Sequence, residues 1–92
     1  MDVILDGTLM ISREAVHDLL LEKLELPDYY GRNLDALYDL LSEYPKKLNI
    51  TVIHKDAMRD SLGNYANALL RTFEDSASAF ENIEFSALDE IF

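Results

Sequence analysis

The sequence predicts an α/β fold in which three parallel strands are packed by about four helices. Three short apolar or β-branched segments, residues 2–5, 48–53 and 83–85, have the composition of strands. Two helical patterns lie between each strand and the next, and strands joined through helices run parallel with right-handed connections. A chain of 92 residues, 49% of them hydrophobic, can bury one modest core. We therefore expect a single domain over residues 1–92.

The first strand is followed by a turn and a helix. Gly7 is the turn residue, and Ser12 is a favourable N-cap for the helix. Pro27 ends this helix, because the residue before a proline avoids helical geometry. The apolar positions share one helical face: Val16, Leu19, Leu20 and Leu24.

The second half of the chain contains the longest helical pattern. Asp56 is a candidate cap for a short helical turn that Gly63 terminates. The long helix that follows has one apolar face, formed by Ala66, Leu69, Leu70, Phe73, Ala77 and Phe80. The last strand and a tail over residues 88–92 close the chain. These patterns predict a core of Val16, Leu20, Leu34, Leu37, Leu41, Ile50, Val52, Leu69, Phe73 and Phe80.

The composition excludes several classes of function. Eight basic and eighteen acidic residues give a net charge of −10, which repels phosphate backbones and favours a basic partner. The absence of cysteine excludes disulfides and thiolate chemistry. We expect a cytoplasmic protein that binds neither nucleic acid nor membrane, because no apolar run is long enough to span a bilayer and no signal peptide is recognisable.

The second helix is predicted over residues 34–43, after a loop over 27–33. Asn33 is placed as its N-cap. Its inward stripe is Leu34, Leu37 and Leu41. Asp35, Asp39 and Ser42 then fall on the outward side, at about 100° per residue. The two carboxylates are one turn apart, where like charges repel.

This acidic helix has three possible interpretations. It could be a solvated face on which Tyr29, Tyr30 and Tyr38 cap the core. It could be a recognition patch in which aromatic rings surround paired anions, suited to an arginine-rich or lysine-rich surface. It could also carry a general acid/base pair, Asp35 and Asp39, but an exposed convex helix lacks the pocket that such a pair needs.

No cofactor or metal is expected from the sequence. His17 and His54 lie in different elements without a second ligand at helical spacing, so each is interpreted as an ordinary, partly exposed histidine. The three glycines are isolated turn residues and form no phosphate-binding loop.

The segment LPDYYGRNLDALYD, residues 26–39, resembles the signature segment of the barstar family. Barstar-like proteins are small intracellular inhibitors of barnase-type, guanine-preferring ribonucleases. The resemblance follows the order of elements over the whole chain, and after residue 44 it depends mainly on LLRTFED, residues 69–75. It implies a parallel sheet in the order 1-2-3. We also expect a non-catalytic protein that is monomeric when free.

The resemblance also implies roles for individual residues. Asp39 would replace a substrate phosphate in the enzyme, Asp35 would pair with another cation, and Tyr29 would pack on the catalytic histidine. Asp75 would add an ion pair from the long helix. Tyr44 either replaces an interface aromatic residue of the family or only precedes the second strand. The partner-binding residues expected on this basis are Tyr29, Asn33, Leu34, Asp35, Ala36, Tyr38, Asp39, Ser42, Tyr44 and Asp75.

Overall fold

The computed structural model describes residues 1–89 and contains a three-stranded parallel sheet with the order β1-β2-β3. The predicted fold class and strand order are confirmed. The elements are β1 (Asp2–Asp6), a 3₁₀ turn η1 (Gly7–Leu9), α1 (Arg13–Lys23), α2 (Leu34–Ser42), β2 (Leu48–Ile53), α3 (Lys55–Leu62), α4 (Asn64–Ala79) and β3 (Ile83–Ala87). Of the predicted C-terminal tail, residues 90–92 lie outside the described part of the chain.

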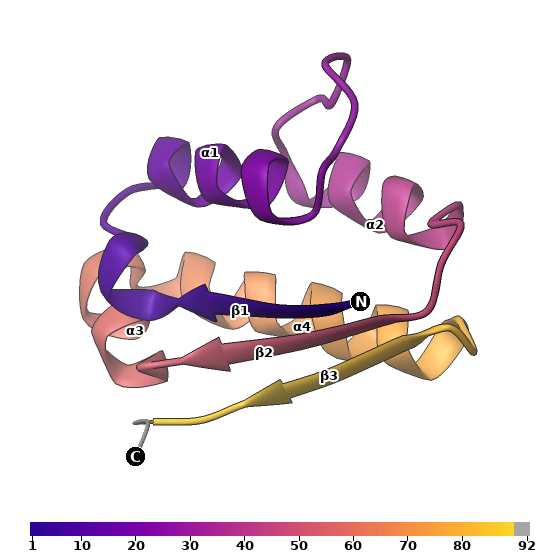
Figure 1. Cartoon of the computed structure of the whole chain (residues 1–92). Helices are drawn as coiled ribbons and strands as arrows, with labels where there is room; N and C mark the ends of the chain where they lie inside the picture. The colour runs from indigo at the N-terminus through magenta and orange to yellow at the C-terminus, as the bar shows by residue number, and fades with distance from the viewer. Residues whose placement is uncertain (90–92) are drawn as a thin grey trace.

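The sheet has one covered face and one open face. Val3 on β1 pairs with Ile50 on β2, which pairs with Phe85 on β3, and these side chains face the helices. On the other face Ile4 and Ser86 are exposed. Figure 1 shows α1 and α2 along one side of the sheet and α4 behind the strands, where it packs against β3 and α2.

Two of the three predicted helix caps are confirmed. The Ser12 hydroxyl accepts a hydrogen bond from the Ala15 N–H at 3.1 Å. The Asn33 side chain accepts one from the Ala36 N–H at 2.8 Å. The prediction for Asp56 is wrong, because α3 begins directly after β2. His54 occupies the cap position in a left-handed conformation without a side-chain cap, and Asp56 lies within the first turn.

The predicted core is confirmed at eight of its ten positions, which are fully buried. Leu34 and Phe80 are only half-buried and pack on the edge of the core. Leu34 is the first residue of α2 and borders a groove. Phe80 follows the last residue of α4, where its ring packs against Tyr38 with a centroid distance of 5.1 Å.

Gly7, the first residue of η1, has a specific steric role. A Cβ atom at this position would overlap the carbonyl oxygen of His54. The end of β1 and the junction between β2 and α3 can therefore approach each other only because residue 7 has no side chain.

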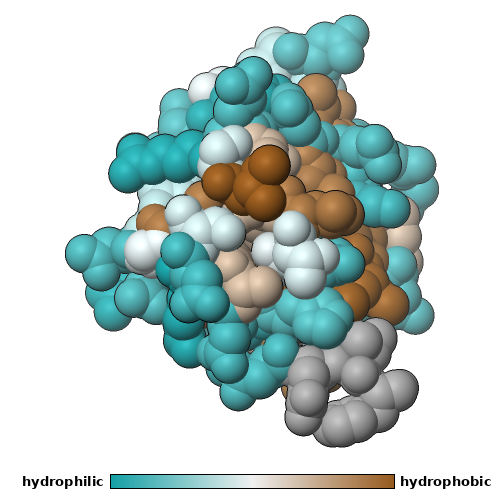
Figure 2. Space-filling model, turned by 90° about the vertical axis from the view of Figure 1, so that its left-hand side faces the viewer, coloured by the Kyte–Doolittle hydropathy of each residue, from teal (hydrophilic) through white to brown (hydrophobic). Residues whose placement is uncertain are grey.

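The end of the molecule that contains η1 and α3 carries an apolar patch within a polar surface (Figure 2). The exposed apolar side chains in this part of the chain include Leu9 and Ile11. Within residues 1–89, no helix combines the length and the apolar character that crossing a membrane requires.

Candidate functional site

The outward side of α2 presents two carboxylates to solvent, as predicted. Asp35 and Asp39 are both exposed. Four ion pairs occur among residues 1–89, and none of them includes either carboxylate. Their mutual repulsion is therefore not offset by a cation of the same chain, and both carboxylates are free to bind an external cation.

Asp75 on α4 lies on the same surface as Asp35. The two residues line a groove of about 370 Å³ between α2 and α4, together with Leu34, Tyr38 and Thr72. Asp75 is exposed and has no ion-pair partner in the described chain. The fold thus combines a third carboxylate with the two on α2, although it is remote in the sequence.

The loop before α2 stands out from the body of the molecule, at the top of Figure 1. Its most prominent side chain is Tyr29, which is 79% exposed. Tyr29, Ala36 and Asp39 line a shallow hollow of about 180 Å³, next to Leu40. Tyr29 and Asp39, an aromatic and an acidic residue that are both predicted to bind a partner, therefore lie beside each other on one surface.

Tyr30, unlike its neighbour, is buried and anchors the loop. Its hydroxyl lies 2.6 Å from Nδ1 of His17, whose Nε2 lies 2.7 Å from the hydroxyl of Tyr65 on α4. His17 is only 3% exposed, so its interpretation as a partly exposed residue was wrong. The sequence contains the signal for this burial, because His17 precedes Leu20 by three residues and Leu24 by seven, on the apolar face of α1.

The pKa values of the buried cluster of His17, Tyr30 and Tyr65 are shifted. Burial, and then the positive charge of Arg32, lowers the pKa of His17, while Asp18 opposes the shift. Burial also raises the pKa of both tyrosines that contact the imidazole. The cluster is therefore neutral near pH 7. His17 adds no positive charge to the acidic surface, which is the surface formed by Asp35, Asp39 and Asp75.

Arg32 forms the second anchor of the loop. Its guanidinium donates to the Asp18 carboxylate at 2.5 Å and to the Glu14 carbonyl at 3.3 Å, both on α1. Its backbone is left-handed, with a φ of 56°. The ion pair holds the positive charge of the loop against α1.

The remaining predicted site residues differ in which of their polar groups are already hydrogen-bonded within the chain. Asn33 uses its side chain within the loop, where it caps α2 and donates to the Gly31 carbonyl. The Ser42 hydroxyl donates to the Asp39 backbone carbonyl. The Tyr44 hydroxyl donates to the Leu24 carbonyl at 3.0 Å, and burial followed by the charge of Glu25 raises its pKa. Only the ring of Tyr44 is therefore available to a partner.

The geometry suits a protein partner better than a small substrate. The hollow beside Asp39, with about 180 Å³, is smaller than usual ligand pockets, which occupy about 300–1,000 Å³. The groove of about 370 Å³ beside Asp35 has the volume of such a pocket but carries two exposed carboxylates instead of a mainly apolar lining. No group of three or more His, Asp or Glu side chains within residues 1–89 could hold a metal ion. What the surface offers is three exposed carboxylates among aromatic rings.

Similarity to known proteins identifies the family of this chain. Residues 1–89 match the family model described as Barstar (barnase inhibitor). The chain belongs to the barstar family. A similar protein from Bacillus subtilis (strain 168), named "Putative ribonuclease inhibitor YrdF", is 37% identical over 90 residues, which cover 96% of this chain and 97% of that protein. Membership of the barstar family confirms the resemblance of residues 26–39 and the prediction of a non-catalytic protein.

Proposed function

We propose that this barstar-family protein inhibits a barnase-type ribonuclease by covering its active site with α2, the loop before it and Asp75. A ribonuclease binds RNA through basic residues, so an inhibitor needs carboxylates that are not neutralised within its own fold. The observation that supports this function best is the absence of ion pairs at Asp35, Asp39 and Asp75 among the described residues.

Each residue then has a specific task. Asp39 occupies the position of a substrate phosphate among the basic residues of the enzyme, and Asp35 pairs with a second cation. Tyr29, which is exposed, packs on the catalytic histidine. Asp75 adds an ion pair from α4. The inhibitor acts in the cytoplasm and is a monomer when free.

A second candidate function is binding of a different basic protein, such as another toxin domain. Lys46 and Lys47 are exposed after α2. They place positive charge near a surface that has to meet a positive enzyme. A partner whose acidic residues lie opposite these lysines would fit this feature better than a uniformly basic active site.

The proposed function is tested by titrating a purified barnase-type ribonuclease with the protein and measuring cleavage of an RNA substrate. Wild type should inhibit stoichiometrically. Asp39→Asn should weaken binding by roughly 30-fold or more, because the cations of the enzyme lose a buried anionic partner. Asp60→Asn on α3 is the matched control, since Asp60 is also exposed but lies outside the acidic surface.

Equal losses of affinity in Asp39→Asn and Asp60→Asn would mean that binding depends only on the net charge. This result would refute the proposed contact between Asp39 and the cations of the enzyme. If wild type inhibits no barnase-type enzyme but is captured by another basic protein, the second function replaces the first.

A further inference from the structure

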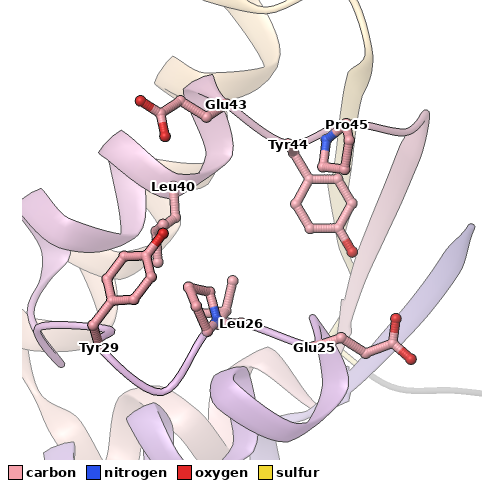
Figure 3. Close-up of a pocket in the computed structure, with 8 residues that line it drawn as sticks. Glu25, Leu26, Tyr29, Leu40, Glu43, Tyr44 and Pro45 are labelled. Atoms are coloured by element: carbon pink, nitrogen blue, oxygen red, sulfur yellow. The ribbon is translucent and has the colours of Figure 1, made fainter.

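A pocket of about 170 Å³ lies beside the acidic surface, between the loop that follows α1 and the C-terminal end of α2. Figure 3 shows the rings of Tyr29 and Tyr44 on opposite sides of it, with Leu26 between them and Leu40 on the side of Tyr29. Pro27 and Pro45 complete its apolar lining. Its volume is too small for most small-molecule ligands and corresponds to one large side chain.

This pocket is continuous with the proposed ribonuclease-binding surface. Tyr29 and Leu40 line both the pocket and the hollow that contains Asp39. A protein that covers Asp39 therefore also reaches the opening of the pocket.

The pocket is formed without a partner. The Tyr44 hydroxyl is held by the Leu24 carbonyl, and the Tyr44 carbonyl accepts a hydrogen bond from the Asn82 side chain at 3.0 Å. On the opposite side, the Leu26 N–H donates to the Leu21 carbonyl at 3.1 Å. Two walls are thus fixed by contacts within the chain.

The rim of the pocket is negatively charged at both ends. Glu25 and Glu43 flank the opening, and Figure 3 shows their carboxylates directed outward from its centre. Neither carboxylate forms an ion pair among residues 1–89, and no basic residue lines the pocket. Glu25 also has a left-handed backbone, with a φ of 54°, at a helix end where glycine is favoured. A carboxylate is therefore present at a position that the backbone alone would assign to glycine.

We infer that this pocket receives an arginine side chain of the bound ribonuclease, outside the cations that Asp35 and Asp39 engage. A guanidinium is flat and stacks on aromatic rings, and its N–H groups point outward in its plane. With the guanidinium between Tyr29 and Tyr44, rotation of the exposed Glu25 and Glu43 side chains brings their carboxylates toward its N–H groups. The aliphatic part of the side chain packs on the leucines and prolines. A lysine lacks the planar group, and an anionic side chain is repelled by both carboxylates.

The inference depends on the proposed function, so the experiment has two arms. The first measures the dissociation constant of the complex with a barnase-type ribonuclease for Glu25→Gln/Glu43→Gln. The control is Glu14→Gln/Glu84→Gln, which removes the same charge from exposed sites on α1 and on the open face of the sheet. The rim variant should bind about tenfold more weakly than the control.

The second arm needs no ribonuclease. N-acetyl-arginine amide is titrated against the free protein while the NMR signals of Tyr44 and Leu40 are followed. These signals should shift saturably, whereas N-acetyl-leucine amide and the rim variant should give no such shift.

The outcomes separate the two proposals. If Asp39→Asn abolishes inhibition but the rim variant equals its control, the arginine pocket is refuted while the proposed function stands. If wild type binds no ribonuclease, the proposed function fails, and the second arm alone decides the chemistry of the pocket. Equal shifts with both amides, or no shift with either, would refute an arginine site.

Discussion

The Nδ1 atom of His17 lies 2.6 Å from the hydroxyl oxygen of Tyr30, and this contact joins α1 to the loop that carries Tyr29. Because Tyr65 contacts the other ring nitrogen, one imidazole connects the loop, α1 and α4. A neutral imidazole has one donor and one acceptor nitrogen, and a tyrosine hydroxyl can serve either. Both polar ends of the buried ring are therefore satisfied.

Replacing Tyr30 by phenylalanine should lower the free energy of unfolding by about 1–3 kcal/mol, because a buried ring nitrogen loses its partner. Urea denaturation measures this change. Tyr29→Phe is the control, since Tyr29 is exposed and its change should leave stability within about 0.5 kcal/mol of wild type. A Tyr30→Phe protein as stable as Tyr29→Phe would show that the hydrogen bond contributes nothing.

The free energy of unfolding should decrease as the pH falls below about 6.5, where an unfolded histidine becomes protonated. The pKa of His17 is lower than this in the folded protein, so the unfolded state binds more protons in this range. The contribution is complete above pH 6.5 and is lost progressively toward the folded pKa. Urea unfolding between pH 7.5 and pH 5 measures the slope.

The slope can be assigned with two histidine variants. His17→Gln should have a clearly smaller pH dependence, whereas His54→Asn should keep it, because asparagine tolerates the left-handed backbone found there. The pKa of Asp6 is lowered mainly by the Thr8 N–H, so this carboxyl changes the free energy of unfolding only below about pH 4. An unchanged slope in His17→Gln would contradict the assignment.

Asp39→Asn should leave the free protein as stable as wild type, or more stable by about 0.2–0.5 kcal/mol, because it removes the repulsion with Asp35. Asp35→Asn also removes this repulsion, but it loses the favourable position of a carboxylate in the first turn of α2. Thermal unfolding at low ionic strength compares the two. A loss of more than 1 kcal/mol in Asp39→Asn would indicate that this carboxylate stabilises the fold.

Leu37→Ala and Phe73→Ala should each reduce the free energy of unfolding by about 2–5 kcal/mol, because both side chains are fully buried and leave cavities. Leu34→Ala should cost clearly less, since Leu34 is only half-buried. Guanidinium chloride unfolding measures all three. Equal effects at Leu34 and Leu37 would mean that the face of α2 assigned to the core is wrong.

Association with a barnase-type ribonuclease should be fast and should slow steeply as salt is added, because a chain with a net charge of −10 meets a basic site. Electrostatically steered protein pairs, of which barnase and barstar are one, associate at about 10⁸–10⁹ M⁻¹s⁻¹ at low salt. Stopped-flow mixing at low and high sodium chloride measures the rate. A rate that does not depend on salt would exclude electrostatic steering.

Local signals in the sequence were sufficient for most of the fold. Ser12 and Asn33 cap helices through contacts within four residues, and Leu37 and Leu41 are buried because they repeat at helical spacing. The left-handed His54 could not be predicted, because it depends on how β2 turns directly into α3. The outward direction of Asp35 and Asp39 followed from the helix alone, whereas the proximity of Asp35 to Asp75 required the packing of α2 on α4.

The two anchors of the loop, at His17 and Arg32, have a consequence for the entropy of binding. Both exist in the free protein, so the loop has little conformational freedom left to lose when a partner arrives. A loop that became ordered only on contact would weaken the affinity by about 1–2 kcal/mol for each residue fixed. Loosening either anchor would therefore reduce affinity through entropy alone, although no atom of the exposed acidic surface changes.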